Sequence, residues 1–432
     1  MHRIAPPDRR SSAFLVLAVM LLVGGAFAAV APAFAQSTAP PRGDRVLTLT
    51  GEPLVGAVGG VAVDAAGFIY SADFRETVYK ITPDGRVSVF ATGLYGASGN
   101  TIDARGNLLQ SSFNGDYITR IDRHGNQEII ADGLAGPVGI AVGATGDLFV
   151  CNCRSNTIAR VDDAGSVSTF AQSDLFRCPN GITRGPDDDL YVVNFSDGRM
   201  LHVTQDGTVS EFALIPGGGN GHVAFARGNF YVTGFQGQRI YRVSTDGEVS
   251  PFAGTGAIGE DDGAAPQATF SWPNGIAAGP QGDRLYVNDF VNRYPPTLAI
   301  PPAPQSSVRV VKLASLADTL ITALQSDGIE AMIAAHRAWK NDPATAALFT
   351  ETEVNQLGYQ LMSSGQLPAA IEVFKLNVEA YPDSFNVYDS LGEAYMNAGE
   401  KELAIENYEK SLEINPANTN AVTMLEKIRG GD

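Results

Sequence analysis

Residues 178–194 read CPNGITRGPDDDLYVVN, and residues 272–289 read WPNGIAAGPQGDRLYVND, so one pattern occurs twice in the chain. Each copy has an Asn-Gly pair beside a proline, then turn residues, then a Leu-Tyr-Val segment typical of a half-buried strand. The motif raises the question of whether its asparagine binds a metal or substrate, or only marks the start of a repeated strand.

The glycine of the motif belongs to a sixfold series. Each member lies seven residues before a turn position that is followed by a strand rich in aromatic and β-branched residues. The series is Gly60, Gly99, Gly139, Gly181, Gly221 and Gly275. A second glycine series, with spacings of 40, 40, 42 and 40 residues, precedes five further short strands: Gly85, Gly125, Gly165, Gly207 and Gly247. Four short strands in about forty residues are typical of a β-propeller blade.

Six inner strands but only five outer strands leave one blade incomplete. The segment RVLTLT, residues 45–50, precedes the first full blade and has no other partner. Pairing it into the last blade would close the ring and cover both sheet edges. The sequence therefore predicts a six-bladed β-propeller over residues 44–314.

The period changes to 34 residues near the C-terminus. Leu357, Gly358, Ala370, Phe374 and Pro382 are matched 34 positions later, in a pattern typical of tetratricopeptide repeats, by Leu391, Gly392, Ala404, Tyr408 and Pro416. The predicted repeats span 351–384 and 385–418, with flanking helices at 329–340 and 421–429, in a helical module over 326–430. The fold class is thus multidomain β + α, a propeller followed by an α-helical solenoid.

The first 35 residues have the features of a signal peptide. A basic leader precedes the apolar run at 13–31, and Ala33-Phe34-Ala35 offers a cleavage site before Gln36. The expected location is the periplasm or the exterior of a bacterial cell. An uncleaved membrane anchor is the alternative.

The net charge argues against two classes of partner. It is −17 for the whole chain, and it becomes −19 without the leader, which carries three basic residues and one acid. Such a surface repels nucleic acid and anionic lipid. We therefore expect no nucleic-acid partner, and no membrane association after signal cleavage.

The three cysteines lack the number and spacing of a zinc site. Second strands end on the face where the next inner strand begins, which brings Cys153, or its neighbour Cys151, close to Cys178. We predict a Cys153–Cys178 disulfide between the third and fourth blades, with Cys151 free.

Taken together, these repeats resemble two known groups. The propeller is similar to the NHL-repeat and regucalcin/gluconolactonase-like proteins, and FAGTGAIGEDDGAAPQATFSWPNGIA (252–277) resembles an NHL linker. NVYDSLGEAYMNAG and ELAIENYEKSLEINP resemble tetratricopeptide tails. The resemblance implies the fold more strongly than an activity.

The residue before each inner-strand glycine is expected to face the mouth of the channel. Four of these positions are polar and are predicted to bind a small polar ligand: Ser98, Asn180, Asn220 and Asn274. Gluconolactonase-like enzymes place a Glu, an Asn and an Asp at such positions to hold a divalent metal. By that resemblance Asn180 and Asn220 would bind Ca²⁺ or another divalent cation. Both acidic ligands of those enzymes are replaced here, so Glu52 or residues 260–262 would have to supply the missing carboxylates. No other cofactor is suggested.

His222 lies two residues after Asn220 and is the candidate general base. Two hypotheses follow. In the first, the protein is an exported scaffold whose propeller binds a ligand or protein and whose helical repeats bind a protein partner. In the second, it is a metal-dependent lactonase or related ester hydrolase with its site at the propeller mouth.

Overall fold

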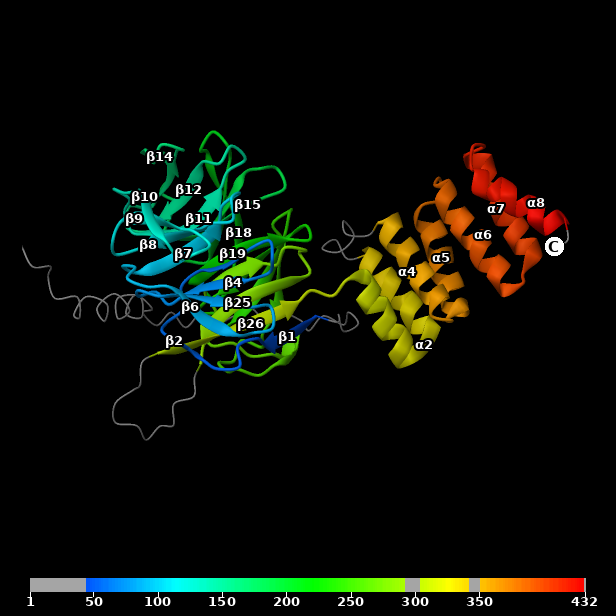
Figure 1. Ribbon diagram of the computed structural model, residues 1–432, viewed down its shortest axis with the longest axis horizontal. Helices are drawn as coiled ribbons and strands as arrows, with labels where there is room; N and C mark the ends of the chain where they lie inside the picture. Colours follow the sequence, from blue (N-terminus) through cyan, green and yellow to red (C-terminus); the bar gives the residue numbers. More distant parts are fainter. Residues whose placement is uncertain (1–43, 292–303, 342–349, 431–432) are drawn as a thin grey trace, which may run out of the picture. The chain divides into compact units, whose positions relative to one another are not determined.

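The computed structural model describes residues 44–291, 304–341 and 350–430 (Figure 1). The predicted signal peptide lies outside these residues. The chain divides into two compact units between Leu313 and Ala314. No helix in the described parts of the chain is both long and apolar enough to cross a membrane.

Five blades of the propeller are four-stranded antiparallel sheets, each formed by consecutive strands from the inside outward. Their strands are β3 (Val61–Val63), β4 (Ile69–Ala72), β5 (Val78–Ile81) and β6 (Val87–Ala91); β7 (Ala97–Ile102), β8 (Leu108–Ser112), β9 (Tyr117–Ile121) and β10 (Gln127–Ala131); β11 (Pro137–Val142), β12 (Leu148–Asn152), β13 (Thr157–Val161) and β14 (Val167–Gln172); β15 (Pro179–Arg184), β16 (Leu190–Asn194), β17 (Arg199–Val203) and β18 (Val209–Leu214); β19 (Asn220–Ala226), β20 (Asn229–Gly234), β21 (Arg239–Ser244) and β22 (Val249–Ala253).

The sixth blade joins the two ends of the propeller sequence. From the inside outward it contains β24 (Ile276–Ala278), β25 (Arg284–Phe290), β26 (Gln305–Lys312) and β1 (Arg45–Thr48). The short strand β23 (Gly263–Ala264) pairs with β1, β2 (Leu54–Val55) pairs with β26, and the 3-10 helix η1 (Ala265–Gln267) follows β23. The prediction that the N-terminal strand closes a ring of six blades is confirmed.

The six inner-strand glycines lie where neighbouring blades meet backbone to backbone. A Cβ atom on Gly99 would lie 2.3 Å from the carbonyl oxygen of Val138, and one on Gly139 would lie 2.4 Å from that of Asn180. The other four glycines would likewise meet atoms of the next blade within 3 Å. The repeat therefore has a steric cause, because a side chain at these positions would separate the blades.

A buried cation links the three segments that close the ring. The fully buried Arg309 of β26 contacts Asp289 at 3.3 Å and Asp262 at 2.7 Å. Asp262 also accepts hydrogen bonds from the backbone nitrogen and the hydroxyl of Thr48 in β1. Burial raises the pKa of Asp289 to about 7, against the opposing effect of Arg309. These contacts connect the N-terminal strand, the link into the last blade and the blade itself.

The second unit consists of paired antiparallel helices: α2 (Leu316–Asn341), α4 (Glu351–Ser363), α5 (Leu367–Ala380), α6 (Phe385–Ala398), α7 (Lys401–Ile414) and α8 (Thr419–Gly430). Gly358 faces the ring of Phe374 and Gly392 faces that of Tyr408, so the small residues allow close helix approach. The element α2 joins two helical segments at Gly328, whose φ of 81° and ψ of −168° are not helical, and the helix predicted at 329–340 corresponds to the segment after this residue. The hydroxyl of Ser315 accepts a hydrogen bond from the backbone nitrogen of Asp318, and the chain bends at Gly328.

We predict that Gly139→Ala destabilises the propeller by about 1–3 kcal/mol, because its Cβ would overlap the backbone of the next blade. Gly51→Ala is the matched control, since no atom lies within 4 Å of its added Cβ. Chemical denaturation of the full chain measures both. Equal stabilities of the two variants would contradict the steric account of the repeat.

Arg309→Met should lower the free energy of unfolding by about 3–5 kcal/mol, because it leaves buried Asp289 without its cation. Arg86→Met, which breaks an exposed pair with Asp84, should change it by less than about 1 kcal/mol. Urea unfolding of both variants tests this, and a small effect at Arg309 would show that the closure does not depend on the ion pair.

Candidate functional site

The predicted mouth residues are all buried in the structure, at the start of the inner strands. Ser98, Asn180, Asn220 and Asn274 are each less than 9% exposed. None of them lines the cavity in the central channel. Their surroundings decide what each side chain does.

Two of the asparagines make hydrogen bonds between blades. Asn180 Nδ2 donates to the carbonyl oxygens of Asn220, at 3.2 Å, and Gly221, at 2.8 Å. Asn274 Nδ2 donates to those of Val58, at 2.9 Å, and Gly59, at 3.1 Å. Each amide therefore satisfies carbonyl groups that the close approach of the next blade has removed from water.

Ser98 and Asn220 differ from that pair. The carbonyl oxygen of Ser98 accepts hydrogen bonds from the backbone of Gly60 and the side chain of Gln110. The side chain of Asn220 is fully buried, and neither end of its amide has a hydrogen-bond partner in the described structure. An unsatisfied buried amide is costly, which makes Asn220 an unusual residue in the core.

A divalent cation bound by Asn180 and Asn220 does not fit this arrangement. The two side chains provide no carboxylate, which Ca²⁺ generally requires. In addition, the amide of Asn220 is enclosed by protein. Among the substitute acids, Asp262 binds Thr48 and Arg309, and Asp261 contacts Thr269. The resemblance to gluconolactonases therefore does not extend to a metal site at these residues.

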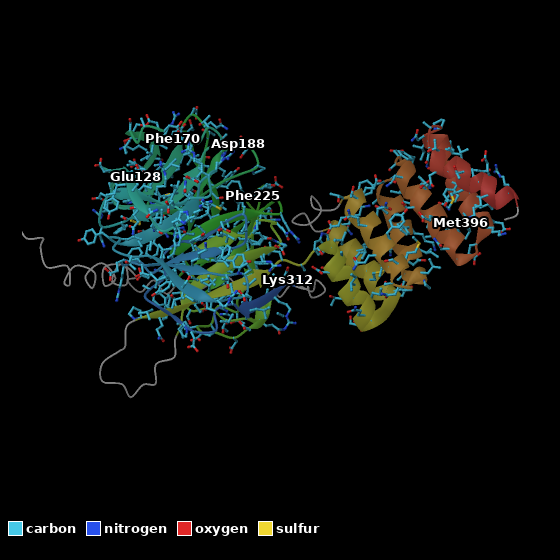
Figure 2. The ribbon with its side chains drawn as sticks, in the orientation of Figure 1. Glu128, Phe170, Asp188, Phe225, Lys312 and Met396 are labelled. Atoms are coloured by element: carbon cyan, nitrogen blue, oxygen red, sulfur yellow. A yellow bond between two sulfur atoms is a disulfide. The ribbon has the colours of Figure 1, made fainter. Side chains whose placement is uncertain are left out.

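The open space lies further along the channel. A cavity of about 370 Å³ is lined by residues that follow the inner-strand glycines of all six blades. Its walls are formed by residues 61–63, 100–102, 139–142, 182–184, 222–225 and 276–278. Figure 2 labels one of them, Phe225. Each inner strand pairs on one side only, so its other edge presents backbone polar groups toward the channel.

His222 contributes an imidazole ring to this cavity. Its backbone nitrogen is held by Thr233 Oγ1, at 2.8 Å, and by the carbonyl oxygen of Asn274, at 2.9 Å. No hydrogen bond to the ring occurs within the described residues. Burial lowers the pKa of His222 to about 4, so the ring is neutral at pH 7 and offers one donor and one acceptor.

The remaining polar lining residues are Asn100, Thr101, Thr183 and Arg184. Asn100 Nδ2 donates to Gln110, whereas its Oδ1 is buried without a partner. Arg184 pairs with Asp188, which Figure 2 also labels. No aspartate or glutamate lines the cavity. The arrangement suits a small molecule with hydroxyl or carbonyl groups more than a metal ion.

Sequence reasoning missed these four residues because it considered only the position before each glycine. Asn100 lies two residues after Ser98 on the same strand, in the same relation as His222 to Asn220. The other three, Thr101, Thr183 and Arg184, lie three or four positions after the residue that precedes the glycine of their strand. Their aliphatic neighbours gave no local signal of a cavity.

The cysteines are arranged as the order of the blades predicts. A disulfide joins Cys153, just after β12, to Cys178, just before β15. Cys151 is free and fully buried, and burial raises the pKa of its thiol. The disulfide therefore connects the third and fourth blades and leaves the buried thiol protonated.

The neutral state of His222 predicts a pH dependence of stability. Between pH 4 and 6.5 the unfolded chain binds a proton at this site that the folded chain does not, so stability falls as the pH falls through this range. His222→Asn should remove about 2–3 kcal/mol of the stability loss between pH 7 and pH 4.5. His124→Asn, in an exposed turn, is the control. Denaturant unfolding at both pH values provides the measurement, and identical losses in wild type and His222→Asn would refute the assignment.

Comparisons with known proteins agree with this architecture. Residues 63–260, less than half of the chain, match the model of the virginiamycin B lyase family, and residues 385–418 match that of the tetratricopeptide repeat. No curated protein matches the sequence.

Several solved structures share the propeller. An auxiliary nutrient binding protein from Bacteroides thetaiotaomicron is 15% identical over 62% of this chain and 76% of that chain, with a TM-score of 0.53. A gluconolactonase from Xanthomonas campestris is 18% identical over 63% and 91%, with a TM-score of 0.49. The virginiamycin B lyase from Staphylococcus aureus is 16% identical over 61% and 98%, with a TM-score of 0.43. At such identities these likenesses concern the fold alone. The chain is a six-bladed β-propeller followed by a tetratricopeptide module, and its propeller is similar to the virginiamycin B lyase family over the matched residues.

Proposed function

We propose that the protein is an exported binding scaffold. Its propeller holds a small polar ligand in the central channel, and its helical repeats bind a protein partner. Solved structures with this fold include both enzymes and a nutrient binding protein, so the fold does not choose between these functions. The choice rests on the residues of the channel.

The imidazole of His222 is the observation that carries the proposal. It lines a cavity of about 370 Å³ and its ring has no hydrogen-bond partner within the described residues, while Asn100 lines the same cavity from another blade, on strand β7. Buried polar groups usually have hydrogen-bond partners, and a bound ligand with hydroxyl or carbonyl groups would supply them. Thr101 of β7 and Thr183 of β15 add hydroxyl groups to the cavity from two further blades.

Export is supported by two independent features. The leader at residues 1–35 has the composition of a signal peptide, and the chain contains a disulfide between Cys153 and Cys178. Disulfides persist mainly outside the cytoplasm. The periplasm or the exterior of the cell is therefore the proposed location, with no membrane association after cleavage.

A lactone or ester hydrolase is the second candidate, and the same imidazole favours it. A neutral histidine in a channel can act as a general base when a substrate places a proton within hydrogen-bond reach. The metal-dependent form of this reaction is less well supported, because Asn180 and Asn220 lack the carboxylates that it would need.

The proposal predicts that a neutral sugar, sugar lactone or polyol raises the melting temperature of the full chain without being consumed. Ca²⁺ should leave the melting temperature unchanged. Thr183→Val should weaken the ligand-induced shift, because it removes a hydroxyl group from the wall, whereas Thr169→Val on the exposed strand β14 should not. A panel of such compounds, followed by thermal unfolding and by product analysis, provides the measurement.

Two results would change the assignment. Lactone hydrolysis that disappears in His222→Asn would favour the enzyme. A ligand shift that is equal in wild type and Thr183→Val would place the ligand outside the channel.

A further inference from the structure

The helical unit has an acidic face that the fold does not neutralise. The face is shared by α4, α6 and α8, and we define it by Tyr359, Asp389, Ser390, Glu393 and Asn420. On α6, Asp389 and Glu393 are four residues apart and therefore lie on one side of the helix. Tyr359 occupies the same repeat position as Glu393, 34 residues earlier.

Direct contacts hold these side chains together. Tyr359 donates its hydroxyl hydrogen to Glu393 Oε2 at 2.9 Å and lies 3.2 Å from the hydroxyl of Ser390. Asn420 Nδ2 donates to Asp389 Oδ2 at 2.8 Å, and Asn418 Nδ2 donates to Asp389 Oδ1 at 2.7 Å. The carboxylates are therefore fixed in place by neutral groups.

No cation compensates for these carboxylates in the described structure. The ion pairs of this unit lie elsewhere, between Lys375 and Glu372, Lys410 and Glu413, and Arg429 and Glu409. Residues 326–430 carry 16 acidic and 7 basic side chains, so the surrounding charge is also negative. A pair of half-buried carboxylates without a cation attracts one from outside.

Two buried polar atoms point to a ligand independently of the charge. The hydroxyl of Tyr408 has no hydrogen-bond partner, although the side chain is fully buried. It lies close enough to Asp389, Glu393 and Tyr359 for their interaction to add to the effect of burial, which raises its pKa. Asn355 Oδ1 on α4, four residues before Tyr359, is also buried without a partner. Such a donor and acceptor suit the carbonyl and amide groups of a peptide backbone.

We propose that the acidic face binds an extended, lysine- or arginine-containing segment of a partner protein. The inference rests on the proposed role of the helical repeats in binding a protein, and it specifies the chemistry of the partner. A cationic side chain of the segment would pair with Glu393 and Asp389, while its backbone would reach the unpartnered hydroxyl of Tyr408. Charge complementarity selects this partner over a neutral or acidic one.

The test uses the full chain and a fluorescein-labelled peptide of alternating lysine and alanine, with glutamine–alanine and glutamate–alanine peptides of equal length for comparison. Fluorescence anisotropy should detect binding of the lysine peptide but not of the other two. The affinity for the lysine peptide should fall as salt is added. Glu393→Gln and Asp389→Asn should each reduce affinity about tenfold. Glu402→Gln removes the same charge from an exposed site on α7 and should have less than about a twofold effect. Circular dichroism verifies that each variant keeps its helices.

Tyr408→Phe separates binding from structure. Removing a buried hydroxyl that has no partner should maintain or raise the stability of the protein, yet lower its affinity for the lysine peptide. An equal loss of affinity in Glu402→Gln would show general charge attraction and overturn the site. If the glutamine peptide binds as well as the lysine peptide, the proposal that the partner segment is cationic is wrong, but the helical repeats still bind a protein segment. If none of the three peptides binds, both the cationic partner and the protein-binding role of the helical repeats are contradicted.

Discussion

The structure depends on the close contact between the backbones of neighbouring inner strands. Six glycines, from Gly60 to Gly275, bring the start of each inner strand against the next blade at distances that exclude any side chain. The contact fixes how tightly the blades surround the channel. It also removes carbonyl groups from water, so other side chains must satisfy them.

That second requirement explains much of the sequence around the glycines. Asn180 and Asn274 donate to carbonyl groups of the following blade, and the hydroxyl of Ser111 lies within hydrogen-bond distance of those of Gly99 and Val138. In the fifth blade Thr233 serves the same purpose toward Asn274. Polar residues near a propeller axis are therefore not evidence of a binding site by themselves. His222 and Asn220 stand apart because their side chains are buried without such a task.

The sequence predicted the architecture well because each structural repeat is visible as a repeat in the sequence. Glycine spacing, strand patterning and the surplus N-terminal strand determined the number of blades and the closure by β1, and the order of the blades indicated the pairing of Cys153 with Cys178. The candidate site was predicted less well. Whether an Asn-Gly asparagine faces open space or the next backbone depends on the angle between blades, which no local pattern encodes. For the same reason, the sequence did not indicate the cavity walls at Asn100 and Thr183.

The protein that emerges has two surfaces that remain chemically incomplete, each within its own unit. One is the channel with an unpartnered neutral imidazole, and the other is a helical face with uncompensated carboxylates. The central claim concerns the imidazole, and an NMR titration of the His222 ring in the full chain tests it most directly. The structure predicts a pKa of about 4, with the ring neutral throughout the physiological range. Titration at the ordinary histidine value of about 6.5 would contradict it, because the ring would then be solvated or paired rather than desolvated at the wall of the channel cavity.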